Sequence, residues 1–182
     1  MNLRANILAA LLIAALTIAA ASCSDLETYS EIPKVEFQKV FLADTTDKDL
    51  GNKEKLQQIT LQITDGDGNL GLYRYGDDTT KNNLFITIFK KEQGQYVRTP
   101  DSIQKFRIPY KQPIGQNKYL RAEVIVSMTT AQIKINYDTV RYEIYIQDRA
   151  DNVSETITTC DIPIRFNGTV YADGTIEEGK QQ

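Results

Sequence analysis

Apolar and polar residues alternate with a period of two along most of the chain after residue 33. This period is typical of β-strands that bury one face and expose the other. Residues 84–89 are apolar on both faces, which predicts a strand in the middle of a sheet. Pro163 interrupts the last apolar segment and predicts an edge strand or a bulge there. The predicted strands are residues 35–41, with an irregularity around Lys39 and Val40, and residues 59–64, 84–89, 120–128, 140–147 and 157–164.

Turn residues separate these segments. Gln93 and Gly94 lie between two alternating runs and predict a β-hairpin. Apart from the N-terminus, no stretch of the sequence shows a convincing helical period. We therefore expect one all-β domain, an antiparallel β-sandwich over residues 34–166. Residues 167–182 are polar, and we expect them to form a frayed tail.

The N-terminus has the pattern of a signal peptide. Arg4 provides a positive charge, and residues 7–21 form an unbroken run of apolar and small residues. This run is shorter than the roughly 20 residues that a membrane-spanning helix needs. The pattern therefore predicts a leader over residues 1–22 rather than a transmembrane anchor.

Cys23 follows a run of small residues at 18–22 and precedes polar, acidic residues. This order is typical of a bacterial lipoprotein, in which the leader is removed and Cys23 becomes the lipidated N-terminus. Residues 23–33 would then form a polar tether. The alternative is an ordinary secretory signal that is cut within residues 19–22. Ala20 stands where lipoprotein signals usually have leucine, so the match is imperfect.

The residues that follow the cysteine, Ser24, Asp25, Leu26 and Glu27, resemble the short acidic export tag of surface lipoproteins in Bacteroidota. The alternative is a solvated acidic linker. A single acyl chain binds membranes weakly, so stable anchoring needs several chains, and bacterial lipoproteins carry several on this cysteine. The resemblance implies a lipid-anchored protein of the outer membrane, exposed on the cell surface.

Residues 59–72, 106–109 and 142–154 resemble uncharacterised Bacteroidota lipoproteins that have a single immunoglobulin-like domain. The last segment also resembles the final strands of bacterial immunoglobulin-like domains, which often read Asp-x-Ala-x-Asn-x-Ser. The resemblance implies that the antiparallel β-sandwich is of the immunoglobulin-like kind. It assigns no activity and no catalytic residue.

Composition narrows the possible functions. The chain has 182 residues and a net charge of −3, which becomes −4 for the 160 residues that remain once the leader is removed. The sequence has no run of basic residues, which is the feature that would indicate a nucleic acid partner. The absence of histidine excludes Ser-His-Asp and Cys-His catalysis and histidine-ligated metals. If Cys23 is acylated, Cys160 has no disulfide partner, and we interpret it as a small buried residue rather than a nucleophile.

The densest group of oxygen ligands contains Asp65, Asp67 and Asn69, whose i, i+2, i+4 spacing is that of a calcium-binding loop. The loop is not an EF-hand. Leu70 occupies the sixth position, where that motif needs glycine, and Gly76 occupies the twelfth, where it needs glutamate.

A second group contains Asp148, Asp151 and Asn152 and follows the strand predicted at 140–147. In an immunoglobulin-like sandwich, the loop between the second and third strands and the loop between the last two strands lie at the same end. We therefore expect the two groups to meet, so that all six side chains can surround one calcium ion.

Other interpretations of the same residues stay open. Asp-Gly and Asn-rich runs form turns on their own, and Arg149 could pair with Asp65 or Asp67 and join the two loops. The carboxylates could also form a glycosidase acid–base pair, which needs a cleft that a small sandwich rarely provides. Tyr73 and Tyr75 could offer a stacking platform for a sugar or a peptide, or could cap the edge of the core.

Together these patterns predict a cell-envelope lipoprotein that is not an enzyme and that binds a glycan or an envelope protein. The alternative is a calcium-binding form of such an adhesion or glycan-capture module. A third hypothesis is a hydrolase that uses Asp65, Asp67 or Asp148 as acid and base.

Overall fold

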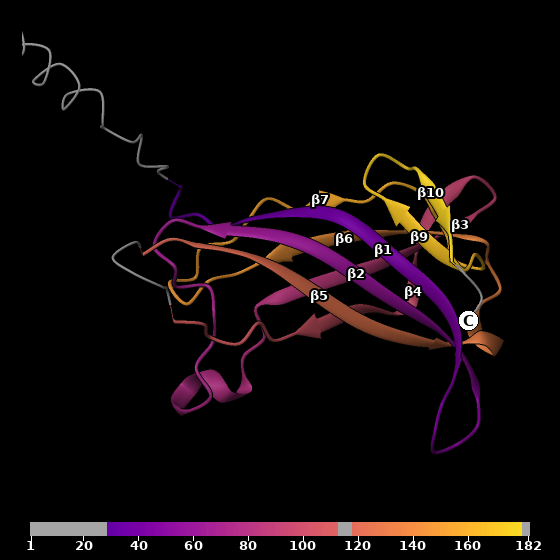
Figure 1. The fold of residues 1–182 in the computed structure, drawn as a ribbon, viewed down its shortest axis with the longest axis horizontal. Helices are drawn as coiled ribbons and strands as arrows, with labels where there is room; N and C mark the ends of the chain where they lie inside the picture. Colours follow the sequence, from indigo (N-terminus) through magenta and orange to yellow (C-terminus); the bar gives the residue numbers. More distant parts are fainter. Residues whose placement is uncertain (1–28, 113–117, 180–182) are drawn as a thin grey trace, which may run out of the picture.

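The computed structural model describes residues 29–112 and 118–179, except for the side chains of residues 77, 78, 100 and 101. These residues form two antiparallel β-sheets and no α-helix (Figure 1). Among them, no helix is long and apolar enough to cross a membrane. The helical elements of this part are two 3-10 turns, η1 (Gly76–Thr80) and η2 (Gln132–Lys134). Cys23 and residues 24–27 lie outside the described residues, so lipidation and the export tag stay predictions.

The strand order defines the two sheets. The first sheet has the order β10-β9-β1-β2-β5, and the second has the order β4-β3-β6-β7, with β8 also pairing with β6. The strands of the first sheet are β1 (Lys34–Thr46), β2 (Lys53–Asp65), β5 (Leu120–Ala131), β9 (Gly168–Tyr171) and β10 (Ile176–Glu178). Those of the second are β3 (Leu84–Glu92), β4 (Gln95–Phe106), β6 (Thr139–Ile146), β7 (Ile157–Thr158) and β8 (Ile162–Pro163).

The inward faces of the two sheets share one core, as in a β-sandwich. Ile59, Leu61 and Ile63 of β2 are almost fully buried, and so are the alternate residues of β6 that face them across the core. The hydroxyl of Tyr142 donates a hydrogen bond to the side-chain oxygen of Gln57, which links the two sheets through buried polar groups. The period-two pattern therefore predicted the core-facing residues of these strands correctly.

Several local predictions are also confirmed. Gln93 and Gly94 connect β3 to β4 with φ angles of 49° and 84°, and these positive values are those of a type I′ hairpin turn. The strand β3 lies between β4 and β6, as its two apolar faces predicted. The register of β1 against β2 shifts between Phe37 and Lys39, which is the predicted irregularity.

The predicted end of the domain at residue 166 is wrong. Residues 168–178 form the β9–β10 hairpin, which pairs with β1 and extends the first sheet. The pattern misses this hairpin because Val170 is its one fully buried apolar residue. Cys160 lies before the hairpin, is partly buried and contacts the carbonyl of Tyr171 through its sulfur, and burial raises the pKa of its thiol.

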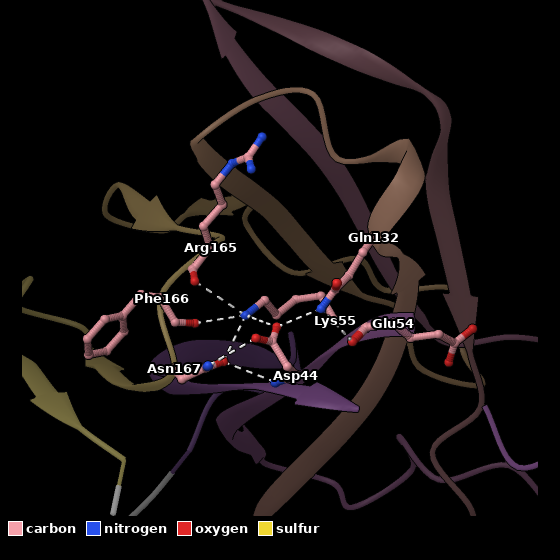
Figure 2. Close-up of polar contacts among 7 residues, drawn as sticks. All are labelled: Asp44, Glu54, Lys55, Gln132, Arg165, Phe166 and Asn167. Carbon is pink, nitrogen blue, oxygen red and sulfur yellow. Dashed lines mark hydrogen bonds and ion pairs between the residues drawn. The ribbon is translucent and has the colours of Figure 1, made fainter. Parts of the chain in front are cut away.

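A buried lysine attaches the segment before this hairpin to the first sheet (Figure 2). The Lys55 side chain is 3% exposed, and its Nζ lies 2.6 Å from an oxygen of Asp44. The same ammonium group donates to the side chain of Asn167 at 2.8 Å and to the carbonyl of Phe166 at 3.1 Å. The hydrogen bond from Lys55 holds the pKa of Asp44 below its ordinary value. The charge of Lys55 is therefore balanced by atoms of the protein itself.

We expect Lys55→Met to lower the free energy of unfolding by about 1–3 kcal/mol, because Asp44, Asn167 and the carbonyl of Phe166 lose their contacts with the buried ammonium group. Urea denaturation measures this loss. The control is Lys53→Met, since Lys53 is an exposed lysine on the same strand. Equal stabilities for the two variants would show that the contacts of Lys55 do not hold the hairpin.

Candidate functional site

The loops after β2 and β6 meet at one end of the sandwich, as predicted. Carboxylate oxygens of Asp65, Asp67 and Asp148 all lie within 4.8 Å of one another. Asp65 is the last residue of β2 in the first sheet, and Asp148 follows β6 of the second sheet by two residues. Each sheet therefore contributes to this group of carboxylates. We call Asp65, Asp67 and Asp148 the acidic cluster.

Asp65 is the most constrained member of the acidic cluster. It is fully buried, and its Oδ2 accepts a hydrogen bond of 2.8 Å from the backbone N–H of Leu70. Its other oxygen, Oδ1, is buried and has no hydrogen-bond partner among the described residues. A buried carboxylate oxygen without a partner is costly, because burial removes the water that would bind it. A ligand, or a proton shared with the neighbouring carboxyl group of Asp67, would satisfy this oxygen.

Asn69 lies beside the acidic cluster. Its side-chain nitrogen donates to Oδ2 of Asp67 at 2.5 Å, and its own Oδ1 is buried without a partner in the described part of the chain. Asn69 thus orients Asp67 and adds a second available oxygen. Its predicted place near the ion is consistent with this geometry.

The three predicted ligands in the loop after β6, Asp148, Asp151 and Asn152, have different roles. Asn152 donates to both oxygens of Asp148, from its backbone N–H and from its side chain, each at 2.8 Å. Asn152 therefore positions Asp148. The prediction that Asp151 joins the cluster is wrong, because its Oδ1 accepts a hydrogen bond from Gln147 and its side chain is exposed. The positive φ of 67° at Asp151 belongs to the turn that brings Asn152 back to Asp148.

Burial is the largest cause that raises the pKa of Asp65, and the hydrogen bond from Leu70 opposes it. The nearby charges of Asp67 and Asp148 raise this pKa further. The result is a pKa of about 6 against an ordinary value of 3.8. Three carboxylates this close cannot all remain charged without a neutralising proton or cation.

Arg149 joins the two loops without pairing with the acidic cluster. Its Nε donates to the carbonyl of Asn69 at 2.8 Å, and its guanidinium lies over the ring of Tyr73 at 4.3 Å. The described contacts of Arg149 include no ion pair with Asp65 or Asp67, so that predicted pairing is wrong. Among the described contacts, Arg149 therefore bonds the backbone of the loop and not the carboxylates of the cluster.

The long loop after β2 is attached to the core by residues that the motif search missed. Leu70 and Leu72 are buried. Asn83, also buried, donates to the carbonyl of Leu70 and accepts from the N–H of Ile108. Apolar residues inside an Asp-Gly-rich loop are the signal that could have predicted this attachment. The part of the loop that follows Asp65 and Asp67 is therefore held against the core.

Gly66 contacts the first described residues of the chain. Its N–H donates to the carbonyl of Ser30 at 2.8 Å. A Cβ at this position would lie 2.2 Å from the carbonyl oxygen of Tyr29, so only glycine fits without movement. Tyr29, Ser30 and the acidic cluster therefore lie at the same end of the molecule.

The predicted tyrosine platform is partly occupied by the protein itself. The rings of Tyr73 and Tyr75 stack at 5.5 Å, Tyr110 packs against Tyr73 at 4.6 Å, and Arg149 covers Tyr73. Tyr75 remains 73% exposed. Of the two predicted residues, Tyr75 alone offers a largely open ring.

The donor atoms of the cluster fit a hard divalent cation. Calcium binds six to eight oxygens, chiefly from carboxylates, carbonyls and water. The three carboxylates, together with the side-chain oxygen of Asn69, supply part of that number.

Comparisons of this chain with protein-family models, curated proteins and solved structures found no match. The functional argument therefore rests on these side chains.

The raised pKa of Asp65 gives a pH-dependent prediction for the protein in chelator. At pH values between 3.8, the ordinary pKa, and about 6, the pKa in the folded state, the folded protein binds more protons at Asp65 than the unfolded chain does. This group therefore adds stability below its unfolded pKa, and that stability is lost as the pH rises through the folded pKa. We expect Asp65→Asn, which cannot ionise, to melt above the wild type near neutral pH. The difference in melting temperature should shrink below the unfolded pKa, and a difference that is constant with pH would contradict the assignment.

Proposed function

We propose that this chain is a lipid-anchored module of the bacterial cell envelope that binds calcium at the acidic cluster and is not an enzyme. Lipidation at Cys23, followed by residues 24–27, would place it on the outer membrane at the cell surface. The observation that carries the calcium proposal is the buried Oδ1 of Asp65, which lacks a partner and lies among two further carboxylates.

The strand order supports an immunoglobulin-like type for this sandwich. The first, second and fifth strands share one sheet, and the third, sixth and seventh share the other. Strands A, B, E and C, F, G are divided in the same way in immunoglobulin domains. The fourth strand joins the third, and the β9–β10 hairpin is an addition at the edge of β1. In such a domain the acidic cluster occupies the loop end, where binding residues commonly lie.

A calcium role accounts for the cluster better than hydrolysis does. A glycosidase places its two carboxyl groups in a cleft with a sugar between them. Here Asp65 and Asp148 are buried, and Asp148 is held by Asn152 on both of its oxygens. Such groups are arranged around a small ion rather than open to a polymeric substrate.

Calcium should raise the melting temperature of the protein by several degrees over the value in chelator, because the ion binds the folded state alone. Asp65→Asn should abolish this rise. Asp151→Asn is the control, since Asp151 lies outside the acidic cluster, and it should respond as the wild type does. Differential scanning calorimetry with calcium and with chelator makes the comparison. No response of the wild type at millimolar calcium would overturn the proposal.

For the partner of this module, we infer an envelope protein that adds an extended strand, rather than a glycan. The edge strands β4 and β5 flank a cleft of about 400 Å³, lined by apolar side chains that include Phe106, Ala122 and Val124. An unpaired edge offers backbone hydrogen bonds to an extended segment, and alternate side chains fill the cleft. Lys111 and Arg107 outnumber Glu123 in the lining, which favours an acidic segment.

Photo-crosslinking in intact cells tests this surface. A photoreactive residue at Ile125, which is 59% exposed and lines the cleft, should form an adduct with an acidic extended segment of one envelope protein. The same residue at Ile133, which is 94% exposed away from that cleft, is the control. Equal adducts at both positions, or none at Ile125, would contradict strand addition.

A further inference from the structure

Half of the tyrosines of this protein gather at the end that carries the acidic cluster. The sequence has 10 tyrosines, and five of them lie here: Tyr29, Tyr73, Tyr75, Tyr110 and Tyr119. The rings of Tyr29 and Tyr119 lie 5.0 Å apart, and Tyr73 contacts both Tyr75 and Tyr110. Tyrosine has an apolar ring and a polar hydroxyl, and it is enriched where hydrocarbon meets water at membrane surfaces.

The chain also enters the domain at this end. The described residues begin at Tyr29, and Ser30 accepts the hydrogen bond from Gly66 beside the acidic cluster. Figure 1 shows that β1 begins where β2 ends. Cys23 precedes Tyr29 by six residues, which span at most about 20 Å when fully extended. A membrane that holds the lipid of Cys23 therefore lies close to the tyrosine-rich end.

The charge of this end depends on the cation. The segments 29–33, 65–83, 107–112, 118–119 and 147–153 together carry six lysines and arginines and seven aspartates and glutamates. A bound divalent cation changes their net charge from −1 to +1. Arg74, Lys111 and Lys118 are exposed there, so the cationic side chains lie outside while the three carboxylates of the cluster surround the ion site.

We propose that the tyrosine-rich end docks, with calcium bound, on the phosphate headgroups of the membrane in which the protein is anchored. This inference rests on the proposed lipid anchor and on the proposed calcium site. Tyr75 lies at the interface with its ring exposed to the lipid, and Arg74, Lys111 and Lys118 face the phosphates. Calcium also changes the net charge of this end from negative to positive, which attracts it to those phosphates. The domain is then held upright, and β9, β10 and the β1–β2 hairpin face away from the membrane.

The absence of tryptophan from the chain makes a direct test possible. Tyr75→Trp places a single fluorescent reporter on the docking end. Ile133→Trp places one at the opposite end, because Ile133 lies in η2, directly after the end of β5 that pairs with the start of β2. Each full-length variant is reconstituted in vesicles of phosphatidylethanolamine and phosphatidylglycerol, of which a fraction carries a nitroxide on the headgroup. In calcium, we expect Tyr75→Trp to lose most of its fluorescence to the nitroxide and Ile133→Trp to keep its own. Chelator, or Asp65→Asn in the Tyr75→Trp background, should restore the lost fluorescence.

Three results would overturn the inference or a part of it, in distinguishable ways. Co-sedimentation with the vesicles and equal quenching of the two reporters in calcium would show that the anchored domain does not dock by this end. Failure to co-sediment would remove the lipid anchor and the docking together. Quenching of Tyr75→Trp that is unchanged by chelator would remove the role of calcium in docking.

Discussion

The buried carboxyl group of Asp65 is the constraint on which the loop end of this protein depends. One of its oxygens holds the backbone of Leu70, and the other has no protein partner in the described structure. Asp67 and Asp148 lie beside it, so the buried carboxyl group of Asp65 meets two like charges. A proton or a cation must neutralise such a cluster. The fold of the loop and its chemistry therefore follow from the same side chain.

Lys55 lies at the other end of the sandwich and also has a buried charge, but this charge has partners within the protein. Asp44, Asn167 and the carbonyl of Phe166 surround its ammonium group, so the protein itself satisfies the charge. That site holds the fold together and has no need of a ligand. Asp65 has one donor, the N–H of Leu70, and its other oxygen lies near two further carboxylates and has no hydrogen-bond partner among the described residues. The contrast between the two buried charges supports our proposal that the loop end binds an ion.

The sequence was sufficient for features that repeat along a strand or follow from topology. The period-two pattern located β2, β3 and β6, and the order of strands in a sandwich was enough to expect Asp65 and Asp148 to meet. Features that depend on a single contact could not be predicted from the sequence. Lys55 is a residue type that is rarely buried, and the β9–β10 hairpin buries little beyond Val170. The position of Asp151 depends on one backbone angle in a turn, which the Asp-rich pattern does not encode.

We propose that an anchor, a tether and an ion site lie at one end of a small sandwich, and the bound ion is the part of this proposal on which the rest depends. A crystal structure of the protein grown with calcium tests that claim most directly. The account predicts electron density for one ion bounded by oxygens of Asp65, Asp67 and Asp148, at the distances of about 2.3–2.6 Å that calcium requires. A structure without an ion, in which a proton shared between Asp65 and Asp67 closes the cluster, would contradict it.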